Sequence, residues 1–126
     1  MNDLIINGEA KTPTIKFNTT GELLISGRSI PENSVEFYEP VIAWLDDYKS
    51  SNSNALNIDI RLEYFNTSSS KCILDLFKKL EEIKDSSKDV NVKWYYESDD
   101  EDMEEAGQDF QAIISVPMEL ISVESL

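Results

Sequence analysis

The stretch "ALNIDIRLEYFNTSSSKCILDLFKKLEEIKD", residues 55–85, decides the fold. Apolar and polar residues alternate over 55–65, which predicts a half-buried β-strand. After the hydroxyl residues at 67–70, the apolar positions follow a helical period and share one face: Cys72, Ile73, Leu76, Phe77, Leu80 and Ile83. A strand that runs almost directly into an amphipathic helix is typical of α/β proteins, in which helices pack on a sheet.

The N-terminal part of the chain predicts a hairpin followed by a helix. Residues 14–18 and 22–27 are strand-like and are separated by the turn residues 19–21. A helix is expected next, up to about residue 51, because apolar side chains recur at three- and four-residue spacings: Val35, Tyr38, Ile42, Leu45 and Tyr48.

Two features concern the start of this first helix. Asn33 and Glu36 have the spacing of a capping box. Pro40 conflicts with a straight helix, because proline lacks the backbone donor and clashes with the preceding turn. The helix therefore either kinks at Pro40 or begins near Glu39, and the sequence leaves both alternatives open.

The C-terminal part predicts two further strands. Residues 90–97 are rich in aromatic and β-branched side chains, as strands are. A short helix is indicated within 99–110, and residues 111–117 are expected to form the last strand. The predicted order is β-β-α-β-α-β-(α)-β. This order predicts an α/β fold, a mixed β-sheet with helices packed on it, in a single domain over residues 1–126.

Composition limits the classes of function. The chain has 126 residues, 25 of them acidic and 11 basic, and its net charge of −14 disfavours nucleic acid and anionic membranes as partners. It has no histidine and one cysteine, Cys72, which excludes His/Cys zinc sites, histidine-dependent nucleophilic catalysis and an internal disulfide. No apolar run approaches the roughly 18 residues of a membrane span. We therefore expect a cytoplasmic protein without a cofactor that is a monomer when free.

An acidic run is the most conspicuous charge feature: Glu97, Asp99, Asp100, Glu101, Asp102, Glu104 and Glu105. A calcium loop of the EF-hand type needs a glycine at its sixth position. Counting from Asp99 or Asp100 puts Glu104 or Glu105 there instead, so the pattern fails and no metal site is predicted. The favoured interpretation is a solvated loop with an acidic helix start, since carboxylates suit a helix N-terminus. A docking surface for a basic partner is the alternative.

The hydroxyl residues from Thr67 to Ser70 exceed what a helix start requires. One hydroxyl is enough for a cap, and Thr67, Ser68 and Ser69 are the candidates. None of them has glutamate or glutamine three residues later, and Lys71 stands at the helix end that disfavours a cation. A phosphate on one hydroxyl would supply the missing negative charge beside free N–H groups and a lysine. The residues alone leave a plain cap and a phosphoacceptor open.

The same region also carries a family likeness. The segments "TPTI" (12–15), "GRSIPENSVEFYEPVIAWLDDY" (27–48), "LEYFNTSSSK" (62–71) and "VKWYYESDDEDMEEAGQDF" (92–110) together resemble the SiaC family of bacterial regulatory phosphoproteins. The likeness spans nearly the whole chain. It implies a fold similar to STAS domains, in which a hydroxyl residue between a strand and a helix N-terminus is the phosphorylation switch.

For the site, the resemblance implies that Thr67, the threonine of the "NTSS" motif, is the phosphoacceptor, with Asn66, Ser68, Ser69 and Lys71 around it. It implies a dedicated kinase of the histidine-kinase ATPase fold and a metal-dependent PP2C-type phosphatase. It also implies that the unphosphorylated protein binds and activates a diguanylate cyclase, which raises cyclic di-GMP. Two alternatives stand beside this function: a STAS-like module that docks constitutively, and a metal-dependent enzyme that works through the acidic carboxylates.

Overall fold

The secondary structure alternates strands and helices after an N-terminal group of strands. The computed structural model describes residues 1–51, 54–86 and 88–126. Its elements are β1 (Leu4–Ile6), β2 (Thr14–Phe17), β3 (Glu22–Ser29), α1 (Ser34–Ser51), β4 (Leu56–Phe65), α2 (Thr67–Asp85), β5 (Val90–Glu97), α3 (Glu101–Ile113) and β6 (Met118–Val123).

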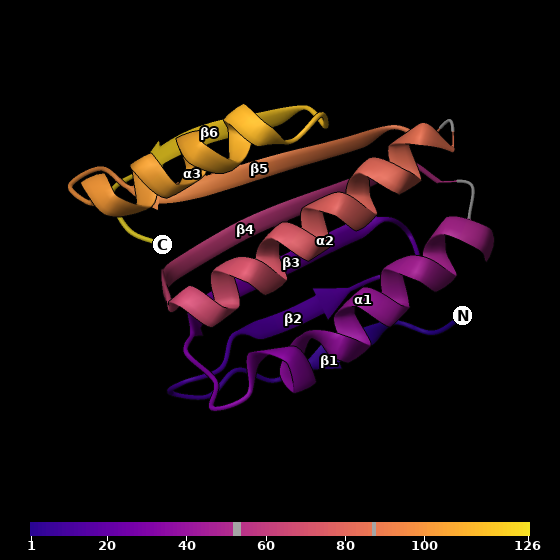
Figure 1. The fold of residues 1–126 in the computed structure, drawn as a ribbon, viewed down its shortest axis with the longest axis horizontal. Helices are drawn as coiled ribbons and strands as arrows, with labels where there is room; N and C mark the ends of the chain where they lie inside the picture. Colours follow the sequence, from indigo (N-terminus) through magenta and orange to yellow (C-terminus); the bar gives the residue numbers. More distant parts are fainter. Residues whose placement is uncertain (52–53, 87) are drawn as a thin grey trace.

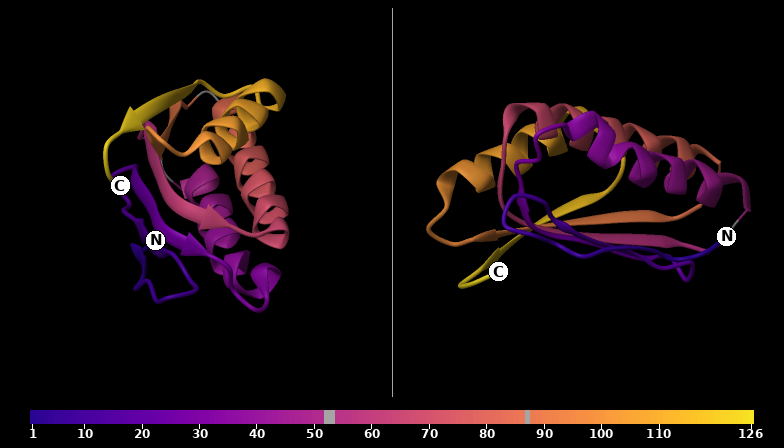
Figure 2. Two further views of the ribbon diagram at one scale, coloured as in Figure 1. Left: turned by 90° about the vertical axis from the view of Figure 1, so that its left-hand side faces the viewer. Right: turned by 90° about the horizontal axis from the view of Figure 1, so that it is seen from below.

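The strands form one mixed sheet in chain order, β1-β2-β3-β4-β5-β6 (Figure 1). The pairs β1/β2 and β2/β3 are antiparallel, whereas β3/β4, β4/β5 and β5/β6 are parallel. The right-hand view of Figure 2 shows that α1, α2 and α3 all cover the same face of the sheet. The predicted α/β class, with helices packed on a mixed sheet, is confirmed. Because the crossover strands are parallel, the helices that follow them all begin at the same end of the sheet.

The core lies between the sheet and the helices. The inward side chains of β4 are at most 1% exposed, and they are Leu56, Ile58, Ile60 and Leu62. The predicted apolar face of α2 lies directly above them, and each of its six members is buried. The alternation and the helical period of the quoted stretch therefore define the two layers that meet in the core.

Helix α1 begins at Ser34 and continues through Pro40 as one helix. The Asn33 side-chain oxygen accepts the Glu36 N–H at 3.1 Å, and the Glu36 carboxylate accepts from the Asn33 side-chain amide at 3.4 Å. The predicted capping pair is therefore present, although the carboxylate meets the side chain of Asn33 and not its backbone. The alternative that the helix begins near Glu39 is wrong.

The buried face of α1 is not quite the predicted one. Tyr38, Leu45 and Tyr48 are buried as expected, but Val35 is 74% exposed. The inward position at the helix start belongs to Ser34, which is four residues before Tyr38 and is 4% exposed. Val35 lies about 100° further round the helix, so it faces solvent.

The C-terminal elements also differ from the prediction. Residues 111–117 were expected to form a strand, but α3 continues to Ile113 and the last strand is β6. Phe110 holds this part of the chain in a helix, since its ring packs against Trp94 at 5.6 Å and Phe77 at 5.1 Å between centroids. The apolar run that looked like a strand therefore contains the end of a helix and the connection to β6.

Gly107 allows α3 to lie close to the sheet. A Cβ atom at this position would lie 2.6 Å from Cδ1 of Trp94 and 2.8 Å from Cδ2 of Leu120. Neither distance is compatible with a side chain at residue 107 unless the neighbouring groups shift. The backbone of α3 thus approaches β5 and β6 to a distance that only glycine permits.

The N-terminal strands include one that the sequence pattern missed. β1 has only three residues and pairs with β2 at the edge of the sheet. The predicted turn between β2 and β3 is confirmed, and Gly21 adopts a φ of 97° there, in the region that favours glycine. In the described part of the chain, no helix is both long and apolar enough to cross a membrane.

Candidate functional site

Asn66 caps helix α2. Its backbone is extended (φ −87°, ψ 175°), and its side-chain oxygen accepts the N–H of Ser69 at 2.9 Å. Its own N–H donates to the carbonyl of Ser29 at 3.1 Å, which ties the helix start to the end of β3. The expectation that one of the hydroxyls of Thr67, Ser68 or Ser69 caps the helix is therefore wrong. An asparagine oxygen can accept a first-turn N–H as well as a serine or threonine hydroxyl can. None of the hydroxyls at residues 67–70 is therefore needed to cap the helix.

Ser69 is instead part of a buried hydroxyl network. The Ser69 hydroxyl donates to the Ser29 carbonyl at 2.9 Å and accepts from the Ser29 hydroxyl at 2.9 Å. Since the Ser29 proton is used in this way, the Tyr38 hydroxyl donates to Ser29 Oγ across 2.6 Å. Burial raises the pKa of Tyr38 to about 12, against the opposing effect of its hydrogen bond with Ser29. The network fixes the N-terminal end of α2 on the end of β3.

Ser68 joins α2 to α1. Its hydroxyl lies 2.8 Å from the hydroxyl of Ser34, the first residue of α1, and it donates to the Asn66 side-chain oxygen at 3.2 Å. The Ser34 hydroxyl also lies 3.4 Å from that of Ser69. Two helix N-termini therefore meet at the hydroxyl cluster, and each brings first-turn N–H groups without a partner inside the helix and the positive end of a helix dipole.

Thr67 is the exposed member of the cluster whose hydroxyl has no partner among the described residues, since Ser68 is exposed but hydrogen-bonded and Ser70 is half-buried. It is the first residue of α2 and is exposed, whereas Ser69 is fully buried. Within the described part of the chain, the Thr67 hydroxyl makes no hydrogen bond. Lys71 lies one turn further along the same outward face and is also exposed. Ion pairs among the described residues use Lys49 and Lys79, and none uses Lys71.

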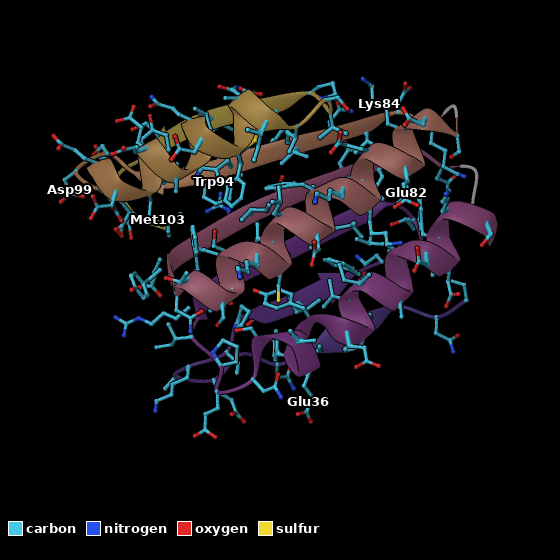
Figure 3. All side chains as sticks on the ribbon, in the orientation of Figure 1. Glu36, Glu82, Lys84, Trp94, Asp99 and Met103 are labelled. Atoms are coloured by element: carbon cyan, nitrogen blue, oxygen red, sulfur yellow. The ribbon has the colours of Figure 1, made fainter. Side chains whose placement is uncertain are left out.

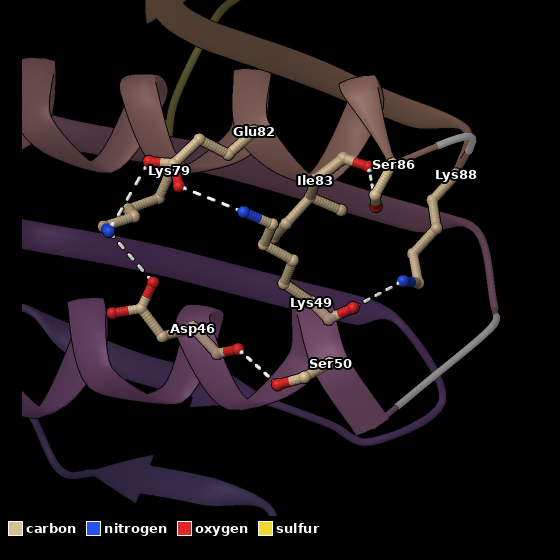
Figure 4. Close-up of polar contacts among 8 residues, drawn as sticks. All are labelled: Asp46, Lys49, Ser50, Lys79, Glu82, Ile83, Ser86 and Lys88. Atoms are coloured by element: carbon tan, nitrogen blue, oxygen red, sulfur yellow. Dashed lines mark hydrogen bonds and ion pairs between the residues drawn. The ribbon is translucent and has the colours of Figure 1, made fainter.

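The opposite ends of α1 and α2 are held together by ion pairs (Figure 4). Lys79 Nζ lies 2.9 Å from Asp46 Oδ1, and Lys49 Nζ lies 3.2 Å from Glu82 Oε1. The hydrogen bond with Asp46 raises the pKa of Lys79, and the hydrogen bond with Lys49 lowers that of Glu82. These pairs are solvent-exposed, so they add little stability, but they keep α1 and α2 in register.

The acidic run surrounds the start of α3 and lies apart from the hydroxyl cluster. The Asp100 side chain caps α3 by accepting the Met103 N–H at 3.1 Å, and acidic residues occupy the first turn. Figure 3 shows Asp99 beside this turn, at the outer end of the molecule. Among the described residues, no three carboxylates or other ligating side chains are grouped so as to hold a metal ion. The predicted acidic helix start is confirmed.

The structure brings together the candidate site residues that the sequence indicated. Asn66, Thr67, Ser68 and Ser69 come together at the start of α2, with Lys71 one turn away. The sequence reasoning missed the contributions of β3 and α1, which are Ser29, Ser34 and Tyr38. The short side chains of Ser29 and Ser34 gave no periodic signal, and the period that included Tyr38 indicated only a buried helix face. The parallel pairing of β3 with β4 brings these residues to the site.

Comparisons with known proteins agree on one family. The family model described as SiaC family regulatory phosphoprotein matches residues 6–123. An uncharacterised protein of Pseudomonas aeruginosa strain UCBPP-PA14 is 36% identical over 118 residues, which is 93% of this chain and 94% of that protein.

Solved structures give the same result. SiaC of Pseudomonas aeruginosa matches with a TM-score of 0.90 and 33% identity, over 98% of this chain and 100% of that one. A chain in the crystal structure of the diguanylate cyclase SiaD in complex with its activator SiaC, from the same organism, matches with a TM-score of 0.91 and 34% identity, over 96% and 100%. The chain therefore belongs to the SiaC family, a family of regulatory phosphoproteins and not of enzymes.

Proposed function

We propose that this chain is a partner-switching regulator whose switch is the reversible phosphorylation of Thr67. The unphosphorylated form binds and activates a diguanylate cyclase, and so raises cyclic di-GMP. The observation that carries this proposal is the contrast within the cluster: the hydroxyls of Ser68 and Ser69 are hydrogen-bonded, whereas that of Thr67 is exposed and bonds to none of the described residues. The Ser70 hydroxyl also has no hydrogen bond among them, but Ser70 is half-buried. A free hydroxyl at the surface is what a kinase needs.

The surroundings of Thr67 suit a phosphate. Phosphorylation adds about −1.5 to −2 charge and three acceptor oxygens. The N-terminus of α2 supplies N–H groups and a positive dipole, and the start of α1 lies beside it through the Ser34–Ser68 contact. Lys71 is one helical turn away and has no ion pair among the described residues. The folded domain should therefore accept the phosphate without rearranging.

A partner that fits the unphosphorylated surface should not accept it. An interface shaped for a neutral threonine hydroxyl would have to bury an unpaired dianion, which is costly. A tenfold loss of affinity requires only about 1.4 kcal/mol. Local charge and bulk are therefore sufficient for the switch, and refolding of the domain is not required.

The partners are inferred from the family. The SiaC in the solved complex is the activator of the diguanylate cyclase SiaD, and this chain is 34% identical to its match there. The kinase of the histidine-kinase ATPase fold and the PP2C-type phosphatase rest on the family resemblance alone. That residues 1–126 form a single STAS-like domain, which is cytoplasmic and monomeric when free, stays a prediction.

A constitutive docking module, with the hydroxyls serving only as a cap, is less well supported. Asn66 provides the cap, and Ser68 and Ser69 have structural partners, so these residues need no switch to explain them. Thr67 has no corresponding structural role. A constitutive module would bind its partner equally well with and without phosphate.

Two measurements test the proposal. Mass analysis of the intact protein and its fragments, isolated from the native host, should find one phosphate, on Thr67. Calorimetry with the diguanylate cyclase of that host should then show tight binding of the unmodified chain and at least tenfold weaker binding of the phosphorylated chain, the estimate for one buried charge clash. Phosphate only at residues 68–70, or equal affinities, would contradict the proposal.

A further inference from the structure

The outer edge of β6 is unpaired. In the sheet that the described residues form, β6 is an end strand and pairs only with β5. The strand at the other end, β1, has three residues, whereas β6 has six. Six extended residues span about 20 Å. The β6 edge is therefore the longer of the two edges at which a further strand can join the sheet.

Hydrogen bonds at the two ends of β6 show which of its backbone groups are free. Val92 donates its N–H to the Pro117 carbonyl at 3.0 Å, and Ser98 donates to the Val123 carbonyl at 2.8 Å. In a parallel pair, alternate residues of a strand bond to the same neighbour, so residues 117, 119, 121 and 123 face β5. The N–H and C=O groups of three residues therefore point outward: Met118, Leu120 and Ser122.

One of these outward groups has a partner. The Met118 carbonyl accepts the side-chain amide of Gln111 at 2.8 Å, which agrees with an orientation of residue 118 away from β5. The N–H and C=O groups of Leu120 and Ser122 have no partner among the described residues. These two residues are spaced as an added strand requires, because strands bond to each other through every second residue.

The edge lacks the features that commonly block an edge strand, which are lysine, proline and a bulge. Residues 118–126 contain no lysine, arginine or proline, and the register of β6 with β5 has no bulge. The strand is apolar on both faces. Met118 and Leu120 pack against the core beneath the helices, whereas Ile121 and Val123 are half-buried on the opposite face (Figure 2).

Helix α3 presents carboxylates to this edge. Ala106 and Phe110 face α2, since both line the groove between the two helices. The other side of α3, from which the Gln111 amide reaches β6, faces the free edge. That side also carries three polar residues: Glu101, Glu104 and Gln108. Because α3 contains no lysine or arginine, its charge at the edge is negative.

The strand itself is acidic as well. Glu119 and Glu124 are exposed. Lys93 of β5 lies opposite Glu119 and offsets one charge, although the two form no ion pair among the described residues. A second copy of this chain, whose net charge is −14, would bring like charges to the edge. A basic segment of another protein complements it.

We propose that the β6 edge binds an extended segment of a partner protein, in which basic and apolar side chains alternate, as a further strand of the sheet. Main-chain bonds to Leu120 and Ser122 supply affinity. The basic side chains lie on the helix side, near the carboxylates of α3, and the apolar ones lie beside Ile121 and Val123. Two strands separate this edge from β4, which leads to Thr67, so the inference does not depend on the proposed function.

A short synthetic peptide with capped ends, in which lysine and valine alternate, is the probe. One control peptide alternates glutamate and valine, and another has the same lysines and valines in two blocks. Calorimetry should show that the alternating lysine peptide binds at least about tenfold more tightly than either control. Hydrogen exchange should show new protection of the Leu120 and Ser122 amides. Absence of binding, or equal binding of the block peptide, would overturn the proposal.

Ser122→Pro tests the edge directly. The Ser122 N–H points outward, so proline removes a donor from the edge and none from the pairing with β5. Ser122→Ala keeps this donor and is the matched control. Thermal unfolding should show that both variants are folded. Ser122→Pro should weaken peptide binding about tenfold or more, and Ser122→Ala should change it within about twofold. Equal affinities of the two variants would contradict the proposal.

A test that leaves the protein unchanged uses the peptide backbone. Methylation of the valine nitrogens, or of the lysine nitrogens, removes alternate N–H donors. Only one of these two sets faces β6 in an added strand, so one methylated peptide should lose binding and the other should keep it. Loss in both, or in neither, would exclude strand addition. A dimer in sedimentation that Ser122→Pro abolishes would assign the edge to a second copy and overturn the proposal.

Discussion

Ser34 Oγ and Ser68 Oγ lie 2.8 Å apart, so the first residue of α1 is hydrogen-bonded to the second residue of α2. The two helices follow adjacent parallel strands, β3 and β4, and for this reason they begin at the same end of the sheet. The contact brings both helix starts to the candidate phosphoacceptor Thr67. A change of charge at Thr67 should therefore affect the surface at the start of both helices without altering the packing of the core.

Replacing Thr67 by alanine should separate the regulatory role from the structural one. The Thr67 hydroxyl has no hydrogen bond among the described residues, and Asn66 retains the cap. Thr67→Ala should therefore lower the free energy of unfolding by well under the roughly 1 kcal/mol of a lost cap. It should keep cyclase binding and lose phosphorylation, as measured by urea unfolding, calorimetry and intact mass. A loss of several kcal/mol would mean that Thr67 is mainly structural.

Replacing Ser69 by alanine should, unlike Thr67→Ala, clearly lower the free energy of unfolding. The change removes the donor to the Ser29 carbonyl and leaves the buried Ser29 hydroxyl without its acceptor. An unsatisfied buried group costs about 1–3 kcal/mol, so urea unfolding should show a loss of this size. Ser70→Ala is the matched control, because Ser70 is only half-buried and forms no side-chain hydrogen bond among the described residues. Similar losses for both variants would refute the importance of the network.

Asn66 offers a test of the cap itself. Asn66→Ala removes the oxygen that accepts the Ser69 N–H, and should destabilise the protein by about 1 kcal/mol. Asn66→Asp keeps an oxygen at this place and puts a negative charge at a helix N-terminus, so it should retain most of the stability. Thermal unfolding of the two variants gives the comparison. Equal destabilisation would show that the amide nitrogen matters and not the accepting oxygen.

Tyr38 predicts how stability depends on alkaline pH. Burial raises its pKa to about 12 in the folded protein, compared with about 10 in the unfolded chain. The folded state thus favours the neutral phenol, and this contribution is complete below pH about 10 and is lost as the pH rises towards about 12. Between these limits the loss amounts to about 2–3 kcal/mol.

Tyr38→Phe should remove this part of the pH dependence. Its free energy of unfolding should fall less steeply than that of the wild type between pH about 10 and about 12. Tyr64→Phe is the control, because Tyr64 is 56% exposed and its ring lies outside the core. Parallel curves for wild type and Tyr38→Phe would disprove the role of the buried phenol.

Much of the fold could be predicted from periodicity. The alternation of β4 and the helical period of α2 are long and regular, because each element has one buried face. The class, the order of the main elements and the buried Cys72 follow from them. β1 was missed because three residues are too few for a pattern, and residues 111–117 were misassigned because Phe110 continues a helix through an apolar run.

The candidate site was predicted in position but not in detail. Local sequence indicated a helix start with surplus hydroxyls, and the family resemblance singled out Thr67. Which oxygen caps the helix depends on backbone geometry, and Asn66 was not considered for that role. Besides Asn66, the partners of the Ser68 and Ser69 side chains lie more than thirty residues away in the chain, in β3 and α1, so only the tertiary fold reveals them.

Gly107 has a consequence for how specificity in this family can vary. A Cβ at this position would meet Trp94 and Leu120 of the sheet beneath α3, whereas the neighbouring helix residues Ala106 and Phe110 line a groove between α2 and α3. A methyl group at residue 107 would push α3 outward and so move Ala106 and Phe110 relative to α2. The shape offered to a partner is therefore adjustable by substitutions that the partner never touches, and binding preferences can diverge between relatives whose exposed residues are the same.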